Sequence, residues 1–72
     1  MATQAAAEVG KRLRAQRKRA GLTLRGLAAE IGTTHVSVIQ WEKGDTSPTF
    51  GHAVALARAL SMSLDWLAFG DR

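Results

Sequence analysis

The segment from Leu22 to Gly44 limits the folds open to this chain more than any other part of it. It contains two short stretches of helical periodicity, Leu24 to about Ile31 and His35 to Lys43, with only three residues between them. The first of those three is Gly32, and so short a turn that opens with glycine joins two helices at a steep angle. The sequence therefore predicts a helix-turn-helix at about residues 23–43.

Capping residues extend this pattern along the chain. Thr23, Thr34 and Ser63 each precede a helical stretch, at a place where a side-chain oxygen accepts a hydrogen bond from a free backbone amide. No alternating strand pattern is present, so we expect an all-α fold, a compact five-helix bundle. The expected helices are Ala5–Arg19, Leu24–Ile31, His35–Lys43, Phe50–Leu60 and Leu64–Phe69.

The length and composition exclude several classes of protein. With 72 residues, the chain fits a single domain, residues 1–72, and we expect residues 1–5 to be a flexible N-terminal arm. There are no cysteines and the two histidines lie far apart, so we expect no disulfide, no metal and no other cofactor. No catalytic motif, secretion signal or membrane-spanning run appears, which predicts a cytoplasmic protein that is not an enzyme and has no small-molecule ligand.

The helix expected at His35–Lys43 has two different faces. Val38 and Trp41 lie on the face that we expect to be buried, together with Thr34 and Glu42. The opposite face carries His35, Val36, Ile39, Gln40 and Lys43. Gln forms paired hydrogen bonds with adenine, His donates to guanine, and Val or Ile packs on the methyl group of thymine. This face therefore predicts contact with base edges in a DNA groove.

The charge also favours a polyanionic partner. The formal net charge is +4, the pI is about 10.8, and six of the ten basic residues fall between Lys11 and Arg19. Within this run we expect Arg12, Lys18 and Arg19 to form a solvated face. His52 has no evident partner in the sequence, and we expect it to be exposed on the fourth helix.

Three motifs occur in a fixed order. They are the spacing of Ala28, Gly32 and Val38, the run Trp41-Glu42-Lys43-Gly44, and the run from Ala59 to Leu67. In this order they resemble the phage repressor and Cro family of helix-turn-helix proteins, the XRE type, from about Val9 to Gly70. The resemblance implies a lambda-repressor-like DNA-binding fold, a homodimer, and operator binding in the control of transcription.

The resemblance also implies positions that contact DNA. His35, Val36 and Gln40 match base-contacting positions, and the outward face adds Ile39. Phosphate contacts or capping are expected at Thr23, Arg25, Thr34, Ser37, Lys43, Thr46 and Ser47. Three residues depart from the family pattern: Leu24 replaces a phosphate-binding Gln, Gly26 replaces Glu or Ala, and Asp45 is acidic where a basic residue is common.

Arg17 and Glu42 match a buried ion pair of the family. The residues support this pairing independently, because Arg17 continues the apolar stripe of Val9 and Leu13 and Glu42 lies on an inward face. A buried charge without a partner would cost much free energy, so each is expected to satisfy the other.

Two functions remain open from the sequence. The first is a regulator, expected to be a repressor, that binds a pseudo-palindromic operator as a dimer through Trp66, Leu67 and Phe69. The second is a protein-interaction module or antitoxin on the same scaffold, since Leu24, Ile39 and Asp45 make the DNA face less polar or less basic. A membrane anchor at Lys11–Arg19 is disfavoured, because that helix carries no aromatic residue.

Overall fold

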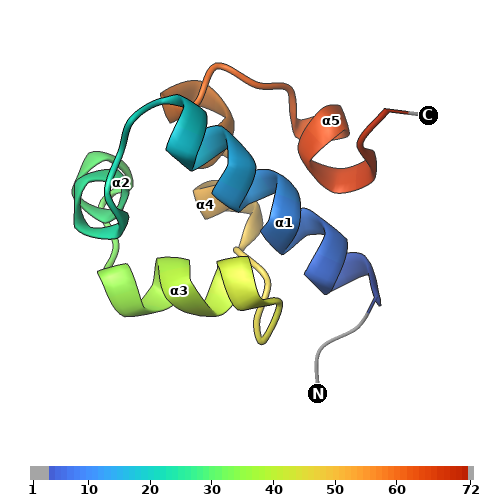
Figure 1. Cartoon of the computed structure of the whole chain (residues 1–72), viewed down its shortest axis with the longest axis horizontal. Coiled ribbons are helices and arrows are strands. Elements are labelled where there is room, and N and C mark those ends of the chain that lie inside the picture. The colour runs from blue at the N-terminus through green and yellow to red at the C-terminus, as the bar shows by residue number, and fades with distance from the viewer. Residues whose placement is uncertain (1–3, 72) are drawn as a thin grey trace.

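Five α-helices joined by short loops make up residues 4–71, the part of the chain that this computed structural model describes (Figure 1). They are α1 (Gln4–Arg19), α2 (Leu24–Ile31), α3 (His35–Lys43), α4 (Phe50–Ala59) and α5 (Leu64–Phe69), and no strand is found between residues 4 and 71. The all-α prediction is confirmed, and the expected bounds differ by one residue at the start of α1 and the end of α4. Of the predicted arm, residues 4 and 5 belong to α1 and residues 1–3 lie outside the described residues.

Side-chain caps fix where the helices begin. Thr23, Thr34 and Ser63 each accept a hydrogen bond from the backbone amide three residues later, at 2.9, 3.2 and 3.0 Å, as the sequence predicts. Thr49 caps α4 in the same way, with His52 N at 3.3 Å. Each such cap stabilises a helix by about 1 kcal/mol.

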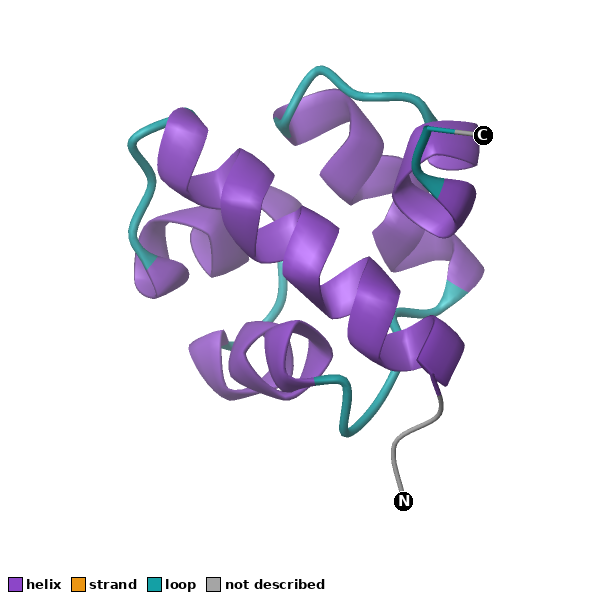
Figure 2. Ribbon diagram, turned by 45° about the vertical axis from the view of Figure 1, so that its right-hand side comes forward, coloured by secondary structure: helices purple, strands orange, loops and turns teal. Residues whose placement is uncertain are grey.

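The core lies where the five helices meet. α1 packs on α3 and α5, α2 packs on α3 and α4, and α4 packs on α5. Figure 2 shows α1 running across the centre of this arrangement. The buried hydrophobic residues are Leu13, Leu27, Ala28, Val38, Trp41, Leu56, Leu60 and Leu67. Val38 and Trp41 thus point inward as predicted, and this fixes the orientation of α3.

Glycine permits the close approach of α1 and α3. A Cβ atom at Gly10 would lie 2.5 Å from the carbonyl oxygens of both Trp41 and Glu42. Gly44, which ends α3 with a φ of +79°, has the backbone of Ala7 directly against it. The backbone of α1 therefore rests on the last turn of α3 with no side chain between them.

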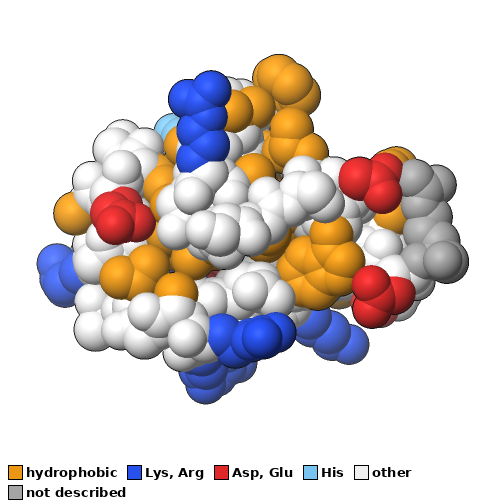
Figure 3. All heavy atoms as spheres, turned by 90° about the horizontal axis from the view of Figure 1, so that it is seen from above, with side chains coloured by type: hydrophobic (Ala, Val, Ile, Leu, Met, Phe, Trp, Pro, Cys, Tyr) orange, Lys and Arg blue, Asp and Glu red, His pale blue; other side chains and the backbone are white. Residues whose placement is uncertain are grey.

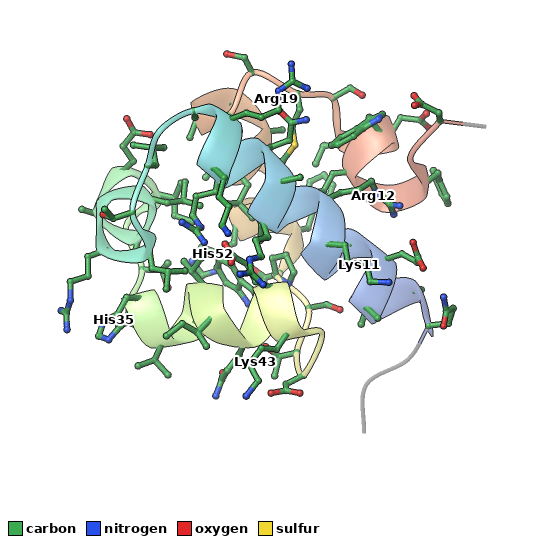
Figure 4. The ribbon with its side chains drawn as sticks, viewed as in Figure 1. Lys11, Arg12, Arg19, His35, Lys43 and His52 are labelled. Carbon is green, nitrogen blue, oxygen red and sulfur yellow. The ribbon has the colours of Figure 1, made fainter. Side chains whose placement is uncertain are left out.

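Two expectations for polar residues are wrong. Arg12 is not part of a solvated face: its Nε and Nη2 donate to the carbonyl oxygens of Leu67 and Ala68, both at 2.9 Å, and Figure 4 shows it against α5. The last carbonyls of a helix lack partners within it, so they attract a cation. His52 is half-buried, with its ring 5.2 Å from that of Trp41 and its Nδ1 3.2 Å from Thr49 Oγ1.

Candidate nucleic-acid interface

The outer face of α3 carries polar and apolar side chains that the core does not use. Val36 is 50% exposed, and Gln40 and Lys43 are exposed. His35 and Ile39 are half-buried at the sides of this face. Figure 4 shows His35 at one end of α3 and Lys43 near the other, at the edge of the helix that no other element covers. The structure therefore brings the four predicted base-contacting residues to one side of one helix.

Hydroxyl groups surround the start of α2 and α3. The Oγ1 atoms of Thr23 and Thr34 accept backbone amide hydrogens as caps, and Thr34 Oγ1 also lies 3.1 Å from Ser37 Oγ. A hydroxyl that accepts one hydrogen bond still has a hydrogen to donate. Arg25 and His35 line a shallow depression of about 270 Å³ over the turn between the two helices. This end of the interface thus offers donors suited to phosphate oxygens.

The end of α3 at Lys43 carries charges of both signs. Lys43 Nζ lies 3.6 Å from the carboxylate of Asp45, and both side chains are largely exposed. Thr46 and Ser47 are exposed in the following loop, but Ser47 lines a groove against α1, α4 and α5. The predicted phosphate contacts at this end therefore adjoin a carboxylate and an apolar groove.

A hydrogen-bonded ion pair holds α3 against α1. Arg17 Nε and Nη2 donate to the two carboxylate oxygens of Glu42 at 2.6 and 3.1 Å, and Nη1 donates to the carbonyl oxygen of Leu22 at 2.9 Å. The two side chains are only 10% and 8% exposed. The hydrogen bond from Arg17 to Glu42 raises the pKa of the guanidinium, against the opposing effect of burial. One side chain thus joins α1, α3 and the loop before α2.

The residues predicted for a dimer surface differ in exposure. Leu67 is 3% exposed and belongs to the core, although it also lines an apolar groove beside α5. Trp66 is half-buried and Phe69 is 60% exposed, and neither lines the apolar groove beside α5. A six-residue helix with apolar residues on every side gives no periodicity from which its buried face could be chosen.

The apolar groove beside α5 was not predicted from the sequence. It has a volume of about 310 Å³ and lies between α1, α4 and α5. Its lining residues are Val9, Ser47, Pro48, Phe50, Ala53, Leu64, Leu67 and Ala68. Phe50, which lines it, is 78% exposed, and an aromatic residue at the first position of a helix is a signal that could have indicated it.

Basic side chains are not confined to α3. Figure 3 shows the face seen from above in Figure 1, away from α3, where basic, acidic and hydrophobic side chains are interspersed. Within the run Lys11–Arg19, Arg17 is buried, Arg12 binds α5, and Arg19 lies at the far end of α1 (Figure 4). The net charge therefore does not by itself locate an interface.

Other kinds of site find little support in the described residues. Between residues 4 and 71, no three His, Cys, Asp or Glu side chains come close enough together to hold a metal ion. None of the five described helices combines the length and apolar character needed to cross a membrane.

Comparison with known proteins identifies the family. The family model described as helix-turn-helix matches residues 13–67, so the chain belongs to the helix-turn-helix family, in agreement with the sequence resemblance. Over 63 residues, 88% of the chain, it is 44% identical to the HTH-type transcriptional regulator DicA of Escherichia coli (strain K12). Over the same length it is 36% identical to the repressor protein C2 of Salmonella phage P22. The chain spans only 47% and 29% of the lengths of these two relatives.

A solved structure also matches most of the chain. The P22 c2 repressor protein in complex with a synthetic operator is 36% identical and superposes with a TM-score of 0.86. The match covers 88% of this chain and 96% of that one. The fold of this chain is therefore that of a phage-repressor DNA-binding domain.

Proposed function

We propose that this chain is a sequence-specific DNA-binding regulator of transcription that places α3 in the major groove. The observation that carries this proposal is the division of α3 into two sides. Val38 and Trp41 are buried in the core. Val36, Gln40 and Lys43 are exposed on a helix edge that no other element covers. An exposed, rigidly held helix of this size fits the major groove of B-DNA.

The proposed contacts divide by chemistry. Base edges are contacted by His35, Val36, Ile39 and Gln40. The phosphates are contacted by Thr23, Arg25, Thr34, Ser37, Lys43, Thr46 and Ser47. Because two relatives are named as a transcriptional regulator and a repressor, we propose repression of a pseudo-palindromic operator as the output. We further propose that residues 1–72 act as a single domain in the cytoplasm and have no enzymatic activity.

A homodimer through the apolar groove would use Leu67 among the residues first expected, but not Trp66 or Phe69. Phe50 and Leu64 are exposed hydrophobic side chains at a groove formed by α1, α4 and α5. A second copy would cover the same residues on both partners, as a two-fold interface requires. Two copies related in this way bind half-sites about one turn of DNA apart, on the order of 34 Å.

The test is binding to duplexes selected from random DNA, followed by fluorescence anisotropy with variants. Gln40→Ala is expected to cost about 1–3 kcal/mol on the selected site and to relax specificity at one base pair. An equal loss on random DNA would contradict a base contact. Lys43→Ala is expected to weaken binding to all sequences and to reduce the salt slope by about one phosphate.

Arg19→Ala is the matched control for Lys43→Ala. It also removes one exposed basic side chain, but at the end of α1 far from α3 (Figure 4). We expect it to leave the salt slope nearly unchanged. If Arg19→Ala and Lys43→Ala reduce the slope equally, the DNA does not lie along α3.

A protein-interaction module is the second candidate. The apolar pair Leu24 and Ile39 beside the interface favours it, and so does the acidic Asp45 next to Lys43. Such a module would bind its partner with little dependence on salt. DNA binding instead weakens steeply between about 50 and 200 mM salt.

A further inference from the structure

Ile39 is a hydrophobic residue that the core does not use. Leu24 and Ile31 are also half-buried, but they pack against the core cluster, whereas Ile39 does not. Instead, Ile39 lines an open recess of about 280 Å³ between α1, α2 and α3. Leu24, at the first position of α2, lines the same recess, which we call the Leu24–Ile39 recess.

Charged side chains form the rest of this recess. Arg14 and Lys43 are exposed and place two cations around it. Arg17 and Glu42 form another part of the wall, and their hydrogen bonds to each other neutralise that part. The recess therefore combines an apolar surface with a cationic rim, which suits an apolar group carried on a polyanion.

DNA presents only one apolar group in its major groove, the 5-methyl group of thymine. Resting on the DNA binding proposed above, we propose that the Leu24–Ile39 recess binds the 5-methyl group of a pyrimidine while Arg14 and Lys43 meet the neighbouring phosphates. Ile39 lies three residues beyond Val36, or about 4.5 Å along the helix axis, so it meets a different base pair. Leu24 thus acts as a specificity-determining residue through an apolar contact, at a position where the family pattern has a phosphate-binding Gln.

The experiment uses DNA in which only methyl groups change. The duplex of highest affinity is selected from a random pool, and each thymine is replaced in turn by uracil. Burying one methyl group contributes about 0.8 kcal/mol, so loss of the critical methyl group is expected to weaken binding about four-fold. Replacing that uracil with 5-bromouracil, whose bromine is close to a methyl group in size, should restore the affinity.

Protein variants assign the methyl group to the recess. At the critical thymine, Ile39→Ala and Leu24→Ala are each expected to abolish the effect of uracil, whereas Val36→Ala should leave that effect intact and abolish the effect at another position. Circular dichroism establishes that each variant is folded. If Leu24→Ala does not fold, the wild-type chain on uracil and 5-bromouracil duplexes and the Ile39→Ala variant still decide the question.

Three results would contradict the methyl contact, and each has a different consequence for the proposed function. Selective, salt-dependent binding in which every thymine effect persists in Ile39→Ala would refute the methyl contact and leave DNA binding intact. Weaker self-association of Ile39→Ala in sedimentation, with unchanged uracil effects, would instead assign Ile39 to a protein interface. Absence of any sequence-selective binding by the wild-type chain would refute the proposed function itself, and the methyl contact with it.

Discussion

Two arginines on α1, five residues apart, join it to different helices by different chemistry. Arg17 binds α3 through the carboxylate of Glu42, and Arg12 binds α5 through the carbonyl oxygens of Leu67 and Ala68. The first partner is a buried charge. The second partner is a pair of backbone groups at an exposed helix end. Arginine thus makes two kinds of junction. At one, losing the partner leaves a buried charge, and at the other, water can partly replace the hydrogen bonds.

This difference corresponds to what each helix is proposed to do. Breaking a buried ion pair leaves a charge without a partner, so the α1–α3 junction fixes the proposed DNA-contacting helix firmly. Neutral carbonyl groups near the surface are rehydrated at modest cost, so the α1–α5 junction holds α5 less tightly. α5 borders the groove proposed for the dimer, where a small adjustment is tolerable.

The largest expected effect comes from breaking the α1–α3 ion pair. Arg17→Met keeps the apolar stem but leaves the Glu42 carboxylate buried without its partner, and should lower the free energy of unfolding by about 3–5 kcal/mol. Urea denaturation would measure this loss, which approaches the whole stability of a small domain. Because the pKa of Arg17 is raised, the contribution of its guanidinium to stability is present below the ordinary pKa of arginine and is lost as the pH rises through the raised value, in strong alkali.

The double variant Arg17→Met/Glu42→Leu is the control. Replacing both members of a buried pair by hydrophobic residues is often neutral, so most of the stability should return. If the double variant is no more stable than Arg17→Met, the loss comes from packing and not from an unpaired charge.

A smaller loss is expected from filling the space at Gly10. In Gly10→Ala the new methyl group meets the backbone carbonyls of Trp41 and Glu42, which move only with α3, and the expected cost is about 1–3 kcal/mol. Gly51→Ala is the matched control, because nothing lies within 4 Å of its Cβ position on α4. It should stabilise the chain by about 0.5 kcal/mol in thermal unfolding. Equal effects of the two substitutions would disprove close contact between α1 and α3.

The smallest effect is expected at the α1–α5 junction. Arg12→Met removes two hydrogen bonds to neutral carbonyls and should cost about 1 kcal/mol. Hydrogen exchange should become faster in α5, including the amide of Gly70 that bonds to Trp66 O, while α3 is unchanged. Glu8→Ala removes a 3.9 Å contact with Arg12 and an exposed hydrogen bond from Gln4 Nε2, and should cost less than about 0.5 kcal/mol. Faster exchange in α3 of Arg12→Met would show that the two junctions are not independent.

The same contrast explains what the sequence could predict. Helix bounds depend on caps such as Thr23 and Thr34 and on periodic apolar residues, all of which are local. Arg17 and Glu42 could be paired because each lies on an inward stripe and each needs an opposite charge. Arg12 could not be placed, because its partners are backbone carbonyls, which every residue possesses and no sequence pattern marks. Leu67 is expected at a dimer surface because so small a chain cannot easily bury it together with Trp66 and Phe69, and five apolar positions out of six in α5 give no pattern that singles it out as the buried one.

The contacts that hold α3 in place are separate from the residues proposed to contact DNA. The backbone of α3 packs directly against Gly10, the side chains of Val38 and Trp41 are buried in the core, and Glu42 pairs with Arg17. His35, Val36 and Gln40 contribute little to holding it in place. Substituting these three residues should therefore change the free energy of unfolding little. A library varied at these positions would yield chains with different binding preferences and the same position of α3.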